Sequence, residues 1–330
     1  MPNIHPKTPG QANYRIINLI EQMVAVAPKG TALGLCDLIS ALFSGYFIES
    51  GGAVMPAVEA FLRQEIQDEK EREARSRRAA KALTYGNYNL KELMDTLQEI
   101  VQAEGHWEPI MVQGYRIVPV DFTAYRRTAV KKLKSKAYVA DANGAVPAVP
   151  IGMIASVGVV NGHRVALLKN AVLADLNVNE SAAHKKRLYK QVMAELDEDE
   201  LAVFDAGFKL VEATETGIQR CLIRLAKNCT FGKTAGRIPE RTSAKGPTPT
   251  QYQAEIVRPL ARQHGDKTLP ATEADEICTM TDESGRELTV HIWHKLHFLE
   301  RHLNDINDGR KKHELRHMPL KVMAIYDPDY

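Results

Sequence analysis

The feature that most constrains the fold of this chain is an Asn-Gly pair between two apolar segments. IGMIASVGVV occupies 151–160, Asn161 and Gly162 follow, and HRVALLK occupies 163–169. Both central residues of a tight two-residue turn need positive φ, which Asn and Gly adopt most readily, so the pattern predicts a β-hairpin. A chain with such a hairpin is expected to build part of its core around a β-sheet.

Apolar runs around the hairpin predict further strands and helices. YRIVPVDFT (115–123), LAVFD (201–205) and QRCLIRLA (219–226) are typical of buried strands. AAHKKRLYKQVMAEL (182–196) has helical spacing, and 207–217 is expected to form a second helix. The order strand, strand, strand, helix, strand, helix, strand predicts an α/β fold in which helices pack against a mixed sheet.

The segments outside this core have a different character. Residues 1–105 show helical spacing without strand-like alternation, whereas 233–330 begin in a Gly/Pro/Thr/Lys-rich stretch and then carry short β-like pieces. We therefore expect three domains: helical at 1–110, an α/β core at 111–232 and a β-rich region at 233–330. The expected N-terminal helices are 14–27, 38–47, 57–83 and 90–103.

Composition excludes several classes of protein. The 330 residues are 44% hydrophobic and 25% charged, proportions that argue against wholesale disorder, collagen and coiled coil. No apolar run approaches the ~18 residues of a membrane span, and the N-terminus lacks the pattern of a secretory signal. The four cysteines have no CxxC spacing, which argues against a disulfide framework and a cysteine zinc site. We expect a soluble, cytoplasmic protein.

Basic residues are concentrated in three segments, although the formal net charge is only +2. Residues 70–81 carry six basic and two acidic residues, 126–136 carry six basic residues and no acid, and 184–190 carry four Lys or Arg. Each segment either neutralises phosphates, with release of counterions, or forms a solvated helix face. Three such segments in one chain favour basic stripes on a neutral body.

Two aspartates, Asp121 and Asp205, each close a strand-like run. Carboxylates at the ends of neighbouring strands can converge on a divalent ion, and their hard oxygens suit Mg²⁺ or Mn²⁺. Two such ions activate the attacking group and stabilise the leaving oxygen of a phosphodiester. Alternatively, each Asp only starts a turn or caps the next helix. Arg126 and Arg127 follow Asp121 closely enough to hold a DNA backbone, whereas Arg224 either contacts phosphate or pairs with an acid.

The stretches IVPVDFTAYRR, IGMIASVGVVNGHRVALL, VFDAGF and CLIRLAKNCTF together resemble bacterial insertion-sequence transposases of the DDE type, over roughly 110–232. The resemblance implies an RNase H-like core in which Asp121 of the D-x-T motif and Asp205 of the D-x-G-F motif bind Mg²⁺ or Mn²⁺. It implies metal-dependent hydrolysis of DNA at element ends and strand transfer to target DNA. A homodimer on DNA, a nucleoid-associated location and DNA binding by the helical domain at 1–110 are also expected. The expected DNA-binding residues are Arg126, Arg127, Lys131, Lys132 and Arg224.

The third acid of that family has no clear counterpart in this chain. It is usually a Glu on a helix that follows the β-rich insertion. Glu300 has the right residue type but lacks the Tyr and Lys that accompany the family's Glu, and Asp327 and Asp329 lie in a Pro-containing turn. The alternative to an active transposase is therefore a truncated, catalytically incomplete relative that binds DNA.

A rival motif, HELRH at 313–317, matches the H-E-x-x-H pattern of zinc peptidases. That chemistry needs two His one turn apart on a helix, a Glu base and a third ligand. The polar flank DGRKK and Pro319 argue against a buried metalloprotease helix, and no His or Glu follows His317. The histidines of HIWHKLHFLERH (291–302) converge on neither a helix nor a strand, so a non-catalytic role is expected for them.

Overall fold

The computed structural model describes residues 9–50, 53–126, 134–139, 144–173, 175, 177, 181–238, 253–282 and 284–326, and the side chains of 9–15, 125–126, 137–139 and 181–182 are outside the description. The chain forms two compact units, Met1–Asn177 and Val178–Tyr330. The division falls inside the core expected at 111–232, and the boundaries at 110 and 232 stay predictions.

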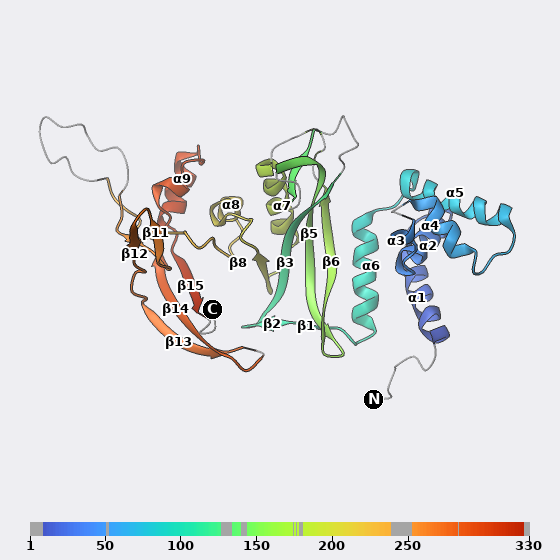
Figure 1. Ribbon diagram of the computed structural model, residues 1–330, viewed down its shortest axis with the longest axis horizontal. Helices are drawn as coiled ribbons and strands as arrows, with labels where there is room; N and C mark the ends of the chain where they lie inside the picture. Colours follow the sequence, from blue (N-terminus) through green and yellow to red (C-terminus); the bar gives the residue numbers. More distant parts are fainter. Residues whose placement is uncertain are drawn as a thin grey trace, which may run out of the picture. The chain divides into compact units, whose positions relative to one another are not determined.

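The first unit begins with helices, as the sequence predicts (Figure 1). The expected helix at 57–83 is wrong as a single element, because the chain forms two helices with a break between them. The second starts where the Asp68 side chain accepts a hydrogen bond from the Lys70 N–H, so a local cap fixes its beginning. The described helices are α1 (Pro9–Val24), α2 (Lys29–Phe43), α3 (Tyr46–Glu49), α4 (Val54–Leu62), α5 (Glu69–Tyr85) and α6 (Leu90–Ala103).

Helices α2 and α5 pack closely because small residues lie at their crossing. A Cβ at Gly34 would stand 2.8 Å from the Arg78 carbonyl oxygen, a distance that only glycine permits. Buried apolar side chains fill the space on both sides of the crossing. The fully buried members include Ile20, Ala41, Val58, Leu62 and Ala79.

A buried carboxylate also joins α2 to α5. Asp37 is 4% exposed. Its Oδ1 lies 2.5 Å from Arg75 Nη2 and its Oδ2 lies 3.1 Å from Arg75 Nε, so the guanidinium donates in the bidentate manner. Arg78 donates a longer bond of 3.3 Å from Nη2 to Oδ2. Two cations therefore share one buried anion.

The rest of the first unit is a curled antiparallel sheet. Its central strand is long and curves visibly (Figure 1), with neighbours on both edges. Asn161 and Gly162 have φ of 50° and 80°, which confirms the turn that the sequence predicts. The strands are β1 (Glu108–Pro109), β2 (Met111–Val112), β3 (Tyr115–Arg126), β4 (Lys136–Val139), β5 (Gly144–Val160) and β6 (His163–Leu173).

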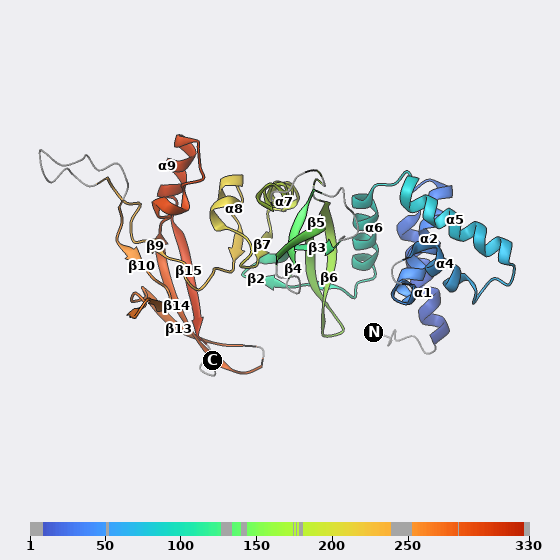
Figure 2. The ribbon, with the colours of Figure 1, turned by 45° about the horizontal axis from the view of Figure 1, so that its top comes forward.

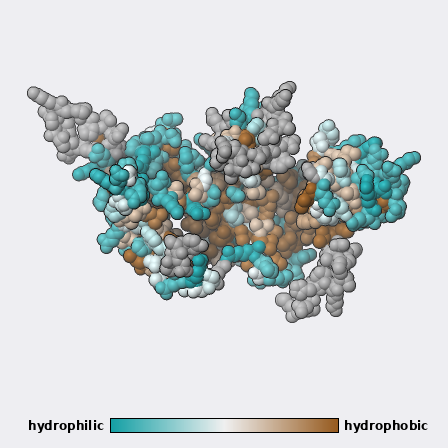
Figure 3. All heavy atoms as spheres, viewed as in Figure 1, coloured by the Kyte–Doolittle hydropathy of each residue, from teal (hydrophilic) through white to brown (hydrophobic). Residues whose placement is uncertain are grey.

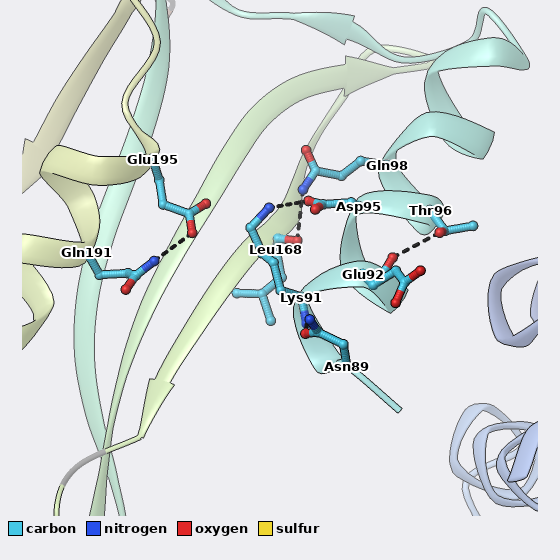
Figure 4. Close-up of polar contacts among 9 residues, drawn as sticks. All are labelled: Asn89, Lys91, Glu92, Asp95, Thr96, Gln98, Leu168, Gln191 and Glu195. Carbon is cyan, nitrogen blue, oxygen red and sulfur yellow. Dashed lines mark hydrogen bonds and ion pairs between the residues drawn. The ribbon is translucent and has the colours of Figure 1, made fainter. Parts of the chain in front are cut away.

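Helix α6 packs along β6, and both ribbon views show the two elements side by side (Figure 2). Gln98 on α6 donates from Nε2 to the Leu168 carbonyl oxygen over 3.0 Å, and Figure 4 shows this bond beside the Lys91–Asp95 pair. On β5, a Cβ at Gly158 would lie 2.3 Å from Cε2 of the Trp107 indole. Glycine at this position thus lets the buried Trp107 indole pack directly against the strand.

The second unit begins with α7 (Ser181–Glu195), β7 (Glu200–Phe204), α8 (Leu210–Thr216) and β8 (Cys221–Ile223). Strands β7 and β8 are parallel, with Val203 opposite Leu222. The intervening helix ends at Gly217, whose φ is 103°. This strand–helix–strand unit has the order that the sequence predicts.

The remaining strands of the second unit form antiparallel pairs, β9 with β10 and β11 with β12, and one three-stranded antiparallel sheet. Its core surrounds Trp293 and Leu296, which are both fully buried. These elements are β9 (Phe231–Gly232), β10 (Ile256–Val257), β11 (Arg262–His264), β12 (Lys267–Leu269), β13 (Glu276–Thr281), β14 (Glu287–Leu296), η2 (Glu300–His302), α9 (Gly309–His317) and β15 (Leu320–Tyr326).

The chain is therefore of the α/β class, with both antiparallel and parallel strand pairing. Most elements after residue 233 are strands, as expected, although several are short and α9 lies between β14 and β15. The RNase H-like identity of the core stays a prediction.

Candidate functional site

Asp121 lies inside β3, and not at the end of a strand as its sequence context predicts. Pairing with the long strand β5 continues past it, from Val120 opposite Ile154 to Arg126 opposite Ala148. Side chains alternate along β3, so Val118 and Val120 are buried whereas Asp121 is exposed on the opposite face. Pairing with β5 therefore fixes the backbone of β3 both before and after Asp121.

The Asp121 carboxylate has few partners. Its Oδ1 accepts a hydrogen bond of 2.7 Å from the neighbouring Phe122 N–H. Within the described chain, no Lys, Arg or His forms an ion pair with it. An exposed carboxylate without a counter-cation retains lone pairs for an external ligand.

Asp205 follows β7 directly, one residue beyond the strand's end. Its Oδ1 accepts a hydrogen bond of 2.9 Å from the Gly207 N–H, which makes an Asx-turn. A Cβ at Gly207 would lie 3.0 Å from this oxygen, so glycine leaves room for the carboxylate. Asp205 thus starts a turn, as the alternative to a metal-binding role predicts, and its side chain is exposed.

Three aromatic rings pack beside the Asp205 turn: Tyr189 from α7, and Phe204 and Phe208 from either side of Asp205. The centroids of Phe204 and Phe208 lie 5.0 Å apart, and each lies 5.7 Å from the Tyr189 ring. Burial raises the pKa of the Tyr189 hydroxyl, which donates to the Lys209 carbonyl oxygen and accepts from the Lys209 N–H. Lys185 Nζ donates to the Gly207 carbonyl oxygen. Sequence reasoning missed this support, because its members are separated along the chain.

Arg224 is held beside the end of β7 by its backbone. Its N–H donates to the Phe204 carbonyl oxygen over 3.0 Å, which continues the parallel ladder. Its side chain is exposed and pairs with no acid among the described residues, so the alternative of an ion pair with an acid is not seen there. It borders a cavity of about 340 Å³ that Phe208, Arg301 and His302 also line.

Of the other expected DNA-binding residues, only the backbone of Arg126 lies within the described part of the chain. Arg126 ends β3, but its side chain lies outside the described residues. Arg127, Lys131 and Lys132 lie wholly outside them. Their expected contact with DNA stays a prediction.

Glu300 is engaged by two cations of α9. Its carboxylate lies 2.7 Å from Lys312 Nζ and 2.5 Å from Arg316 Nη2, and Arg316 is only 5% exposed. Burial raises the pKa of Glu300, but the hydrogen bonds from both cations outweigh this and keep the pKa below its usual value. Glu300 therefore stabilises the packing of α9. Asp327 and Asp329 lie outside the described residues.

The HELRH motif forms the last turns of α9. The rings of His313 and His317 lie 4.4 Å apart, one helical turn from each other. Glu314, which would be the base of a peptidase, pairs with Arg310 at 3.2 Å. Among the described residues, no group of three or more His, Cys, Asp or Glu side chains is arranged to hold a metal ion.

The histidines of 291–302 each have a separate partner, which agrees with a non-catalytic role. His294 Nε2 lies 3.2 Å from Glu276 Oε2, and His297 Nδ1 lies 3.1 Å from the Arg316 carbonyl oxygen. The His291 ring lies 4.5 Å from the Tyr326 ring. These contacts hold β14 against its neighbours.

Comparison with known proteins finds no matching family model, no matching curated protein and no matching solved structure. In the described part of the chain, every helix is too short or too polar to cross a bilayer.

Proposed function

We propose that this chain is a DDE-type transposase that cuts DNA at element ends and joins the freed 3′-hydroxyl to target DNA. One observation carries the proposal. Asp121 and Asp205 are both exposed, both held by fixed backbone, and both free of ion pairs within the described chain. Asp121 lies on β3, and Asp205 follows β7 in the strand–helix–strand unit β7, α8 and β8.

The donor chemistry of these two residues fits a divalent metal ion. Carboxylate oxygens on an exposed surface are the ligands that Mg²⁺ and Mn²⁺ prefer. When bound, the ions would activate the attacking oxygen and stabilise the leaving oxygen of a phosphodiester. Asp121 and Asp205 are the residues that would hold them. The Asp205 turn, fixed by Gly207 and by the rings beneath it, keeps its carboxylate at one place and so reduces the cost of ordering it.

The proposal includes an RNase H-like core and a homodimer on DNA in the bacterial nucleoid. Arg126, Arg127, Lys131, Lys132 and Arg224 would neutralise backbone phosphates, a contact that fixes position without reading sequence. Arg224 supports this role best, because its guanidinium is exposed and lacks an acidic partner in the described chain.

Nicking of a supercoiled plasmid that carries the coding region with its native flanking DNA tests the proposal. We expect metal-dependent nicking that chelation abolishes. Asp121→Asn and Asp205→Asn keep the side-chain shape but remove the charge, and each should lower the nicking rate by about 100-fold or more. Asp175→Asn is the matched control, because Asp175 also accepts an Asx-type bond, of 2.9 Å from Asn177. Nicking that survives either substitution, or that needs no metal, refutes the proposal.

A second candidate function is that of a catalytically incomplete, DNA-binding relative. The engagement of Glu300 by Lys312 and Arg316 favours it, because the nearest match to the third acid is committed to holding α9. Plasmid that is bound but not nicked, at any concentration of Mg²⁺ or Mn²⁺, would select this candidate.

A further inference from the structure

A basic cavity lies in the first unit, between the start of α2 and the second half of α5. Its volume is about 640 Å³. Arg77, Arg78 and Lys81 line it together with Thr31 and Tyr85, and none of the described residues that line it is acidic. The acidic residues of α5 are Glu69, Glu71 and Glu73, and Glu73 lies one turn before Arg77 and pairs with it. Figure 3 shows a largely hydrophilic surface over the helices of this part of the chain.

The positive charge in this cavity is only partly neutralised. Arg78 shares the single carboxylate of Asp37 with Arg75, and its Nε is buried without a hydrogen-bond partner among the described residues. Lys81 is exposed, and no acid in the described chain pairs with it. Within the same residues, Arg77 pairs only with the exposed Glu73, an interaction worth about 0.5 kcal/mol. Arg77 and Lys81 can thus bind an anion with little loss of interaction energy inside the protein.

The spacing of the lining residues suits a chain of phosphates. Arg77, Lys81 and Tyr85 follow one another at intervals of four residues, so they form a stripe roughly 12 Å long on one face of α5. Neighbours in the stripe are about 6 Å apart along the helix, so each of the three side chains can meet a separate phosphate of one DNA strand. Tyr85 is 85% exposed, and its hydroxyl can donate to a phosphate oxygen.

We infer that this cavity binds the sugar-phosphate backbone of duplex DNA, an inference that rests on the proposed function for the choice of ligand. Arg77, Lys81 and Tyr85 contact phosphates directly. Arg78 adds positive potential from within the cavity, while its bond to Asp37 holds α5 in place. The contact is independent of base sequence, because phosphates are the same at every base pair and carry no sequence information directly.

Fluorescence anisotropy with a short labelled duplex of mixed sequence tests the inference on the full chain. Each phosphate contact that is lost lowers the salt slope of log K by about 0.9. We expect the Arg77→Gln, Lys81→Gln double variant to lose about 1.8 of this slope and to bind more weakly at every sequence tried. Arg63→Gln on α4 is the matched control, because Arg63 is as exposed as Arg77 and also pairs with a Glu one turn away.

The outcomes separate this inference from the proposed function. Asp121→Asn and Asp205→Asn should lose nicking but keep the wild-type slope, whereas the double variant should lose slope. If the wild type binds with the expected slope but never nicks, the cavity stands and the transposase proposal falls. A double variant with the slope of Arg63→Gln overturns the inference. So does a wild-type chain that fails to bind duplex or prefers single strands. Circular dichroism of the double variant checks that its helices remain folded.

Discussion

Removal of the buried carboxylate of Asp37 should destabilise the helices of the first unit. Asp37→Asn keeps the shape of the side chain but leaves Arg75 and Arg78 without a counter-charge. When one partner of a fully buried ion pair is removed, the cost is about 3–5 kcal/mol. Here the side chains of Arg75 and Arg78 are 29% and 38% exposed, so both can turn partly toward water. We therefore expect a loss of about 2–3 kcal/mol.

Hydrogen exchange measured on peptides of α2 and α5 reports this loss locally, which matters because a chain of two compact units need not unfold in one step. The exchange of α2 and α5 amides should accelerate by about 30- to 150-fold, the equivalent of 2–3 kcal/mol. Glu59→Gln, which breaks the exposed pair with Arg63, is the control and should change exchange by less than about threefold. If Asp37→Asn behaves like this control, the ion pair contributes nothing to the crossing of α2 and α5.

Two further predictions concern the sheet of the first unit and the core of the second. Gly158→Ala should displace the Trp107 indole and shift tryptophan emission to the red, at a cost of about 1–3 kcal/mol, whereas Gly144→Ala, with open space around its Cβ, should do neither. Burial lowers the pKa of His302, whose Nδ1 accepts the Leu299 N–H, so stability should be full above about pH 6.5 and fall as acid protonates the ring. His302→Gln should flatten this decline in urea titrations, and an equally steep decline would contradict the assignment.

Local patterns in the sequence determined much of the secondary structure. The expected helix at 90–103 matches α6, and the Asn161-Gly162 turn joins β5 to β6 with the positive φ values that those residue types favour. Both signals are contained within a few consecutive residues, so they need no tertiary information. The pattern at 57–83 predicted one helix where the chain forms two, again because it reports only on neighbouring residues. Its apolar spacing is helical throughout, and only the Asp68 cap marks where a new helix begins.

Only part of the candidate site could be predicted from the sequence. The sequence alone singled out Asp121 and Asp205 by residue type and by the strands before them. It placed Asp121 at a strand end, because the length of β3 depends on pairing with β5 and not on its own residues. The support of the Asp205 turn by Tyr189 and Lys185 could not be foreseen, since it comes from the preceding helix through side-chain packing.

The sequence by itself determined most of the helical and extended segments, the place of the Asn161-Gly162 turn, and the segments that are rich in positive charge. Tertiary structure alone decided which charges are used internally. Asp37 meets Arg75 across 38 positions of sequence, and Glu300 meets Arg316 across 16. The physical reason is range: backbone preference acts between neighbours along the chain, whereas ion pairing and burial depend on distances that exist only after the helices have packed.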